Sequence, residues 1–159
     1  MAETKELNLE QKVTIKSIAG WTTGFARRAD GIGDITIAPN GSVRLSRNEI
    51  ITQVQNGNKL LSGVDGLGSH ATLIIDDAPT RVECGFESED GKTKKQLVFS
   101  EEEMTRIFSL KTQAAFERAF KEAICTRAEK YAVIEFLKQG KINDYQKIRF
   151  AENYTGFRL

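Results

Sequence analysis

The sequence contains a single histidine, His70, and only two cysteines, Cys84 and Cys125. One histidine excludes a metal site built from several histidines, and no Ser-His-Asp triad can be assembled around it with any recognisable motif. The cysteines form no Cys-x-x-Cys pair, which indicates two reduced thiols in an intracellular protein. The acidic clusters lack the EF-hand spacing. We therefore expect no catalytic residues, no metal and no cofactor, and predict that the protein is not an enzyme.

Long apolar segments and an excess of one sign of charge are missing too. The 23 basic and 22 acidic residues give a net charge of +1, which disfavours non-specific binding to nucleic acid or to a membrane surface. No apolar segment is long enough to predict a transmembrane helix. Residues 1–10 are charged and polar, unlike a secretory signal, and we expect them to form a flexible arm.

What the sequence does contain is typical of a globular protein, with 40% hydrophobic and 28% charged residues in 159. Residues 34–58 give the clearest pattern. Apolar and polar residues alternate on both sides of a turn at Pro39-Asn40-Gly41, which predicts two strands. Ser46 and Glu49 then have the spacing of a capping box, and residues 56–58 end the short helix that follows.

The rest of the first 99 residues is expected to be mostly β structure. Alternation and turn residues predict strands at 13–18, 21–28 and 71–75, and a hairpin formed by 80–87 and 93–99. Gly24, inside the second strand, indicates a bulge or a close backbone approach. Residues 63–70 contain three glycines before a strand, so we interpret them as a mobile connection and not as a phosphate-binding loop.

At Ser100 the hydrophobic period changes from two to 3.6. Ser100, Thr112, Thr126 and Asn143 are expected to cap successive helices, each with an apolar stripe. The predicted fold is therefore α+β. A small β-barrel or β-sandwich-like block with one short helix occupies residues 11–99, and a helical block at 100–159 packs on it or forms a subdomain.

Three segments are candidates for contacts with partners: 1–10, 63–70 and 153–159. The candidate interface residues within them or near them are Trp21, Asp65, Leu67, His70, Tyr154 and Phe157. Tyr154 and Phe157 are expected beyond the last regular helix, where a surface of this chain or of another must cover them. The alternative for His70 is an ordinary turn residue, and for Trp21 a core residue.

The stretch from Val13 to Ile50, with short strands leading through Pro39-Asn40-Gly41 into a capped helix, resembles a pattern in small structural proteins of tailed bacteriophages. The resemblance implies a non-enzymatic assembly role in the capsid or connector. It places the protein in the virion, and in the host cytoplasm during assembly. The implied partners are other virion proteins or copies of the same chain.

Two other classes of function stay open from the residues alone. One is a phage or bacterial regulator that binds a host protein or nucleic acid. Arg27, Arg28 and the lysines at 92, 94 and 95 could touch phosphates, but acidic neighbours accompany them and the interleaved aromatics of an RNA-binding sheet are missing. The other is an enzyme, which the lack of a catalytic constellation disfavours.

Overall fold

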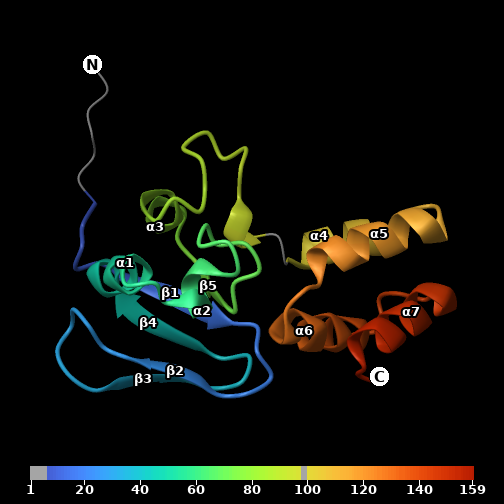
Figure 1. The fold of residues 1–159 in the computed structure, drawn as a ribbon, viewed down its shortest axis with the longest axis horizontal. Coiled ribbons are helices and arrows are strands. Elements are labelled where there is room, and N and C mark those ends of the chain that lie inside the picture. Colours follow the sequence, from blue (N-terminus) through green and yellow to red (C-terminus); the bar gives the residue numbers. More distant parts are fainter. Residues whose placement is uncertain (1–6, 98–99) are drawn as a thin grey trace.

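The structure is a computed structural model that describes residues 7–97 and 100–159. It has an α+β fold in two lobes, with strands first and helices after them (Figure 1). We call residues 7–97 the β lobe and residues 100–159 the α lobe. The expected flexible arm at 1–10 falls largely on residues 1–6, which lie outside the described residues.

The β lobe contains two antiparallel sheets. The larger has the order β4-β1-β5 and the smaller is the pair β2-β3. The strands are β1 (Lys12–Ser17), β2 (Thr23–Ala26), β3 (Asp34–Ile37), β4 (Ser42–Ser46) and β5 (Leu73–Ile75). Gly24 makes the close approach expected of it, because a Cβ there would lie 2.8 Å from the carbonyl oxygen of Ile35.

Both sheets bury side chains in one core. Its fully enclosed members include Val13 and Ile15 of β1, Ile37 of β3 and Ile75 of β5. The alternation of side chains along a strand explains which residues are buried. Every second residue of β1 is buried, and Ile15 lies opposite Ile75 on the neighbouring strand. Helices α1 (Arg47–Gln55) and α2 (Lys59–Ser62) follow β4 and contribute Ile50 and Leu61 to the same core.

The barrel expectation is not confirmed, because the described strands form two open sheets. The main reason lies at residues 80–99, where we predicted a hairpin. Helix α3 (Ala78–Glu83) occupies the first half of the predicted arm 80–87, because Asp77 accepts the N–H of Thr80 and Pro79 lies in the first turn. The rest forms one isolated bridge, Glu87 to Lys94, and the 3₁₀ helix η1 (Lys95–Leu97). The second predicted arm ends at residues 98–99, which lie outside the described residues.

Two further predictions for the β lobe are wrong. The β lobe has three α-helices where we expected one short helix. Cys84 does not alternate within a strand, because it is the C-cap residue of α3. Gly85 follows with φ of 80°, a left-handed conformation that ends the helix.

The α lobe consists of α4 (Glu101–Phe108), α5 (Gln113–Ala123), α6 (Arg127–Leu137) and α7 (Tyr145–Thr155). Ser100, Thr112 and Thr126 cap the first three helices as predicted, whereas Asp144 and not Asn143 caps the last. The core of the lobe is rich in phenylalanine and includes Phe108, Phe116, Phe120, Phe136 and Leu137.

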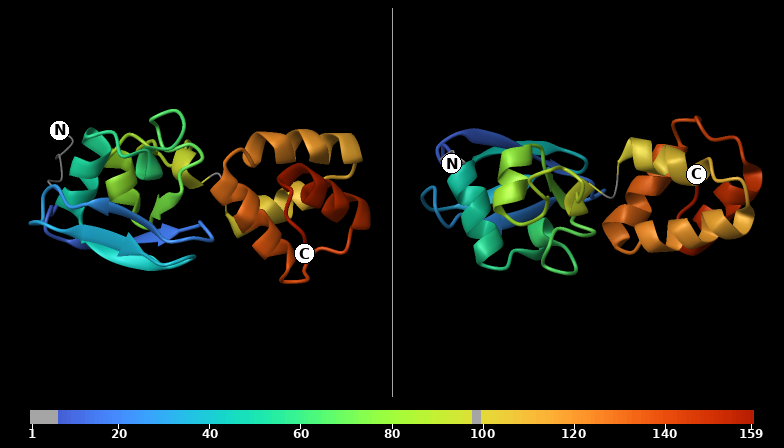
Figure 2. Two further views of the ribbon diagram at one scale, coloured as in Figure 1. Left: turned by 60° about the horizontal axis from the view of Figure 1, so that its bottom comes forward. Right: turned by 90° about the horizontal axis from the view of Figure 1, so that it is seen from above.

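The two lobes lie side by side (Figures 1 and 2). The β1–β2 and β3–β4 turns lie at the end of the β lobe that faces α6, and the β2–β3 loop lies at the opposite end (Figure 1). The molecule is therefore elongated, with the joint between the lobes near its middle and the β2–β3 loop at one tip.

Candidate interaction site at the joint between the lobes

One histidine–carboxylate contact links the lobes at the start of α6. The Nδ1 atom of His70 lies 2.9 Å from a carboxylate oxygen of Glu129, and the two side chains are 15% and 1% exposed. Glu129 also completes the capping box of α6, since its carboxylate accepts the backbone N–H of Thr126 at 3.0 Å and of Cys125 at 3.1 Å. A buried carboxylate thus holds both the helix terminus and the opposite lobe.

An aromatic contact lies beside this histidine–carboxylate contact. The ring of Trp21 meets the ring of Tyr131 edge-on at 6.4 Å between centroids, and the guanidinium of Arg127 lies 5.4 Å from the Trp21 ring. The ring of Phe157 also packs edge-on against Tyr131, with 6.1 Å between the ring centroids. A Cβ at Gly20 would lie 2.2 Å from the Tyr131 ring, so only glycine fits there.

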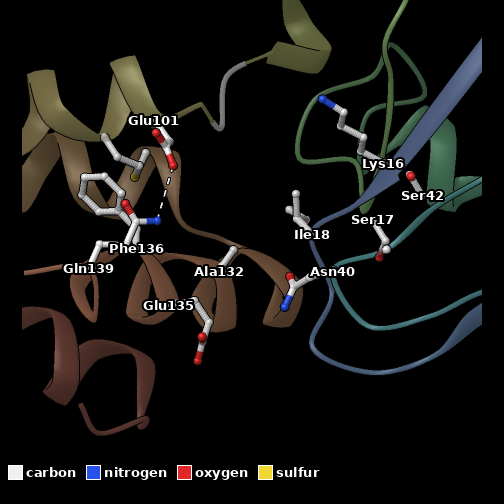
Figure 3. A pocket seen from close by; sticks show the side chains of 12 residues that line it. Lys16, Ser17, Ile18, Asn40, Ser42, Glu101, Ala132, Glu135, Phe136 and Gln139 are labelled. Atoms are coloured by element: carbon white, nitrogen blue, oxygen red, sulfur yellow. Dashed lines mark hydrogen bonds between the residues drawn. The ribbon is translucent and has the colours of Figure 1, made fainter.

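Beside these contacts the lobes enclose a cleft of about 440 Å³ (Figure 3). The β lobe forms one wall with β1 and the β3–β4 turn, and the α lobe forms the other with α4 and α6. The lining residues are Lys16, Ser17, Ile18, Asn40, Gly41, Ser42, Glu101, Met104, Ala132, Glu135, Phe136 and Gln139.

The floor of the cleft is apolar and its rim is charged. Met104 and Phe136 are buried at its base, and Ile18 and Ala132 are half-buried beside them. On the rim, Lys16 belongs to the β lobe, whereas Glu101 and Glu135 belong to the α lobe (Figure 3). The cleft thus has one basic and one acidic wall.

The rim charges make only exposed contacts within the chain. Lys16 Nζ is 3.6 Å from Asp76, and Lys138 Nζ is 2.9 Å from Glu135. Glu101 accepts a 3.4 Å hydrogen bond from Gln139 and lies 3.9 Å from Lys141. Solvent-exposed pairs of this kind contribute little to stability, so the rim charges can exchange these partners for others.

The chemistry of the cleft suits the binding of a polypeptide segment. Its lining holds no histidine or cysteine, and its hydroxyls, those of Ser17 and Ser42, have no histidine beside them. Within residues 7–97 and 100–159, no group of three or more His, Cys, Asp or Glu side chains is arranged to hold a metal ion. An apolar floor with separated positive and negative walls is suited to a polypeptide segment that has an apolar residue between charges.

The structure places half of the predicted interface residues around the joint. His70 and Trp21 make the contacts described above, and His70 is therefore more than an ordinary turn residue. Phe157 reaches the joint through Tyr131. None of them lines the cleft itself.

We expected Tyr154 to lie beyond the last helix, but it lies within α7. Its hydroxyl donates to the carbonyl of Ile124 at 2.9 Å, and its ring packs edge-on against Phe120 at 5.5 Å. Burial raises the pKa of the Tyr154 hydroxyl, and nearby Cys125 and Glu129 add to the effect. The α lobe itself therefore covers this aromatic residue.

Asp65 and Leu67 lie on the 63–70 loop, away from the cleft. The Asp65 carboxylate accepts the backbone N–H of Leu67 at 2.8 Å and of Ser69 at 3.2 Å. Partial burial acts to raise the pKa of Asp65, but these hydrogen bonds outweigh it and lower the pKa. Leu67 is 48% exposed, and at Gly68 a Cβ would lie 2.8 Å from the Phe86 ring. Whether the loop becomes ordered on assembly stays a prediction.

Sequence reasoning missed the cleft. It assigned Met104 and Phe136 to apolar helix stripes, which is correct but does not reveal that both reach the floor of a cleft. Ile18, Glu101 and Glu135 come from segments far apart in the sequence, and only the docking of α6 on the β lobe brings them together. No local pattern signals such an arrangement.

Comparison with models of protein families, with curated proteins and with solved structures gives no match to the chain. Within the described residues, none of the helices has the length and apolar character needed to cross a membrane.

Proposed function

We propose that the protein is a non-enzymatic assembly protein of a bacteriophage particle, associated with the capsid or connector. It acts in the virion, and in the host cytoplasm during assembly, through protein–protein contacts. The observation that supports this function best is the cleft between the lobes, in which an apolar floor separates Lys16 from Glu101 and Glu135. A segment of a neighbouring virion protein binds there.

The energetic argument rests on the floor. An apolar side chain that leaves water for a pocket of this kind gains about 1.5–3 kcal/mol. The charged rim adds orientation more than affinity, because its groups stay close to solvent. The resemblance of residues 13–50 to small phage structural proteins supports the particle as the setting.

A regulator that binds a host protein or nucleic acid is the alternative. The two glutamates on the α-lobe wall disfavour the phosphate backbone of nucleic acid as the occupant of the cleft, because like charges repel in close contact. A host protein segment would satisfy the same chemistry as a virion protein, so the partner itself must be identified.

Incorporation into particles tests the proposal. A tagged chain is expressed during infection, and purified particles are assayed for it. The wild type should co-purify with particles, and Glu135→Lys should lower its incorporation about tenfold through charge repulsion and loss of the acidic wall. Glu122→Lys makes the same charge change on the exposed surface of α5, outside the cleft, and should have no effect.

The other outcomes separate the alternatives. Recovery of the chain with a host protein and not with particles would replace the proposal by the regulator. A salt-dependent shift of DNA or RNA by the purified chain would favour a nucleic-acid regulator. Equal incorporation of both variants would show that the cleft is not the binding site.

A further inference from the structure

The β2–β3 loop, residues 27–33, projects from the end of the β lobe opposite the joint (Figure 1). At its tip Ile32 is 101% exposed, the largest exposure of any large apolar residue among those described. Gly31 and Gly33 flank it with φ of 91° and 117°, and neither has an atom within 4 Å of a Cβ position. The loop thus presents one isoleucine to solvent without neighbours that cover it.

The base of this loop is fixed from inside the protein. Glu49, which is 0% exposed, accepts the backbone N–H of Arg28 at 2.9 Å and of Ala29 at 3.2 Å. The Asp30 carboxylate accepts the Ser46 hydroxyl. A buried carboxylate with several backbone donors is a strong restraint, so residues 28–30, which lead to the tip, are ordered before the loop meets a partner.

Exposed charges of opposite sign lie on the two sides of the tip. Arg28 precedes the tip and Asp34, the first residue of β3, follows it, whereas the carboxylate of Asp30 is engaged by the Ser46 hydroxyl. In the part of the chain that the structure describes, neither Arg28 nor Asp34 takes part in an ion pair. The loop therefore offers an apolar residue between a positive and a negative group.

The cleft has the complementary arrangement, an apolar floor between Lys16 on one wall and Glu101 and Glu135 on the other. We infer that the occupant of the cleft is the β2–β3 loop of a second copy of this chain. Ile32 enters the apolar floor, Arg28 pairs with the glutamate wall, and Asp34 pairs with Lys16. This inference rests on the proposed function and names the partner for it.

The location of the two surfaces determines the kind of assembly. Loop and cleft are different surfaces, the loop at the tip of the β lobe (Figure 1) and the cleft at the joint, so a copy whose loop fills one cleft still has its own cleft available for the loop of a further copy. A heterologous, head-to-tail contact of this kind builds a ring if the rotation between neighbouring copies closes, and an open filament if it does not. A symmetric dimer is not expected from it.

Analytical ultracentrifugation of the full chain over a range of concentrations tests the contact. The wild type should grow beyond dimers, and Ile32→Ser and Glu135→Lys should each weaken association about tenfold or more while circular dichroism stays unchanged. Tyr145→Ser removes another exposed large side chain, at the start of α7 and outside the three candidate contact segments, and Glu122→Lys is the charge control; neither should matter.

Mixing the two defective variants tests the head-to-tail geometry. Ile32→Ser retains a working cleft, and Glu135→Lys retains a working loop. Their mixture should form heterodimers and stop there, because each pair has only one intact contact. Arg28→Glu should weaken association, and Arg28→Glu combined with Glu135→Arg in one chain should restore it.

Several results would overturn the inference. They are a monomeric wild type at all concentrations, association that neither variant weakens, or association that Tyr145→Ser weakens while both variants do not. The particle assay then separates the inference from the proposed function. A monomeric chain that still enters particles leaves the function standing with another virion protein in the cleft, whereas a monomeric chain absent from particles contradicts both.

Discussion

His70 and Glu129 connect the two lobes, and the carboxylate of Glu129 also caps the N-terminus of α6. The distance from Nδ1 of His70 to the carboxylate is 2.9 Å, and the same carboxylate accepts the backbone N–H groups of Cys125 and Thr126. The start of α6 and the docking of the lobes therefore depend on one side chain. The cleft lies beside this contact, so its shape depends on the pair as well.

We expect Glu129→Ala to cost roughly 2–3 kcal/mol of unfolding free energy, since it removes the cap of α6 and the partner of His70 together. His70→Ala removes only the contact between lobes and should cost about 1 kcal/mol. Urea denaturation measures both. Glu103 occupies the same N3 position in α4 but pairs only with exposed Arg106, so Glu103→Ala should change stability by about 0.5 kcal/mol or less. Equal losses at both glutamates would contradict the double role of Glu129.

Phe120 tests the core of the α lobe. Its side chain is fully buried, and the rings of Phe116 and Tyr154 both lie 5.5 Å from it. Phe120→Ala should cost about 3–5 kcal/mol through the cavity that it leaves. Ser100→Ala, which removes only the cap of α4, should cost about 1 kcal/mol in the same denaturation series. Small and equal losses would contradict the helical packing.

Local signals predicted much of this fold correctly. The caps at Ser46, Ser100, Thr112 and Thr126 depend on a side chain that reaches the backbone three residues ahead, so the sequence alone reveals them. The strands around Pro39-Asn40-Gly41 follow from alternation and turn chemistry for the same reason.

Contacts between distant residues could not be predicted. Glu49 has the spacing of a capping box, yet its carboxylate binds the backbone of residues 28–30 and not its own helix terminus. Lys147 is buried because it donates to the carbonyls of Phe108 and Leu110. Helix α3 was missed because the alternation of residues 80–87 outweighed the start signal at Asp77-Ala78-Pro79.

Asp77 gives a prediction for pH. Partial burial acts to raise the pKa of its carboxyl, but hydrogen bonds from Thr80 and Arg47 outweigh this and lower the pKa below its usual value. A lowered pKa in the folded state means that the stabilisation is present above the unfolded pKa, about 3.9, and is lost as pH falls through the folded pKa.

Asp77→Asn should therefore destabilise the protein by about 1–2 kcal/mol at pH 7, and the difference from wild type should shrink toward pH 2. Thermal or urea unfolding across pH measures this. Asp76→Asn is the matched control, because Asp76 pairs only with exposed Lys16 and should contribute about 0.5 kcal/mol or less. A difference for Asp77→Asn that persists undiminished at pH 2 would show that charge is not the cause.

The two thiols should differ in reactivity. Burial raises the pKa of Cys84 to about 12, and Glu83 adds to the shift. Burial also raises the pKa of Cys125, with Glu129 acting in the same direction and Lys130 against it, but this thiol is exposed. A thiol reagent at pH 7.5 should modify Cys125 first and Cys84 only on unfolding, both slower than free cysteine. Cys125→Ser should abolish the earlier phase of modification. If it abolished the later phase instead, Cys84 and not Cys125 would be the more reactive thiol.

Glu49 links the stability of the β lobe to the presentation of Ile32. Glu49→Ala leaves the backbone N–H groups of residues 28–30 without their acceptor, so hydrogen exchange at these amides should accelerate. The pairing of β1 with β4 should stay protected, because its hydrogen bonds do not involve the loop. Asn48→Ala, at an exposed neighbour in the same helix, should leave the loop unchanged.

If the loop enters the cleft of a second copy, Glu49→Ala should also weaken association although it alters no residue of the contact. A loop that is no longer held in place must be ordered on binding, and each newly restrained residue adds about 1–2 kcal/mol of entropic cost. Association that stays at the wild-type level while the 28–30 amides exchange faster would show that Ile32 needs no fixed loop, and that its exposure serves another purpose.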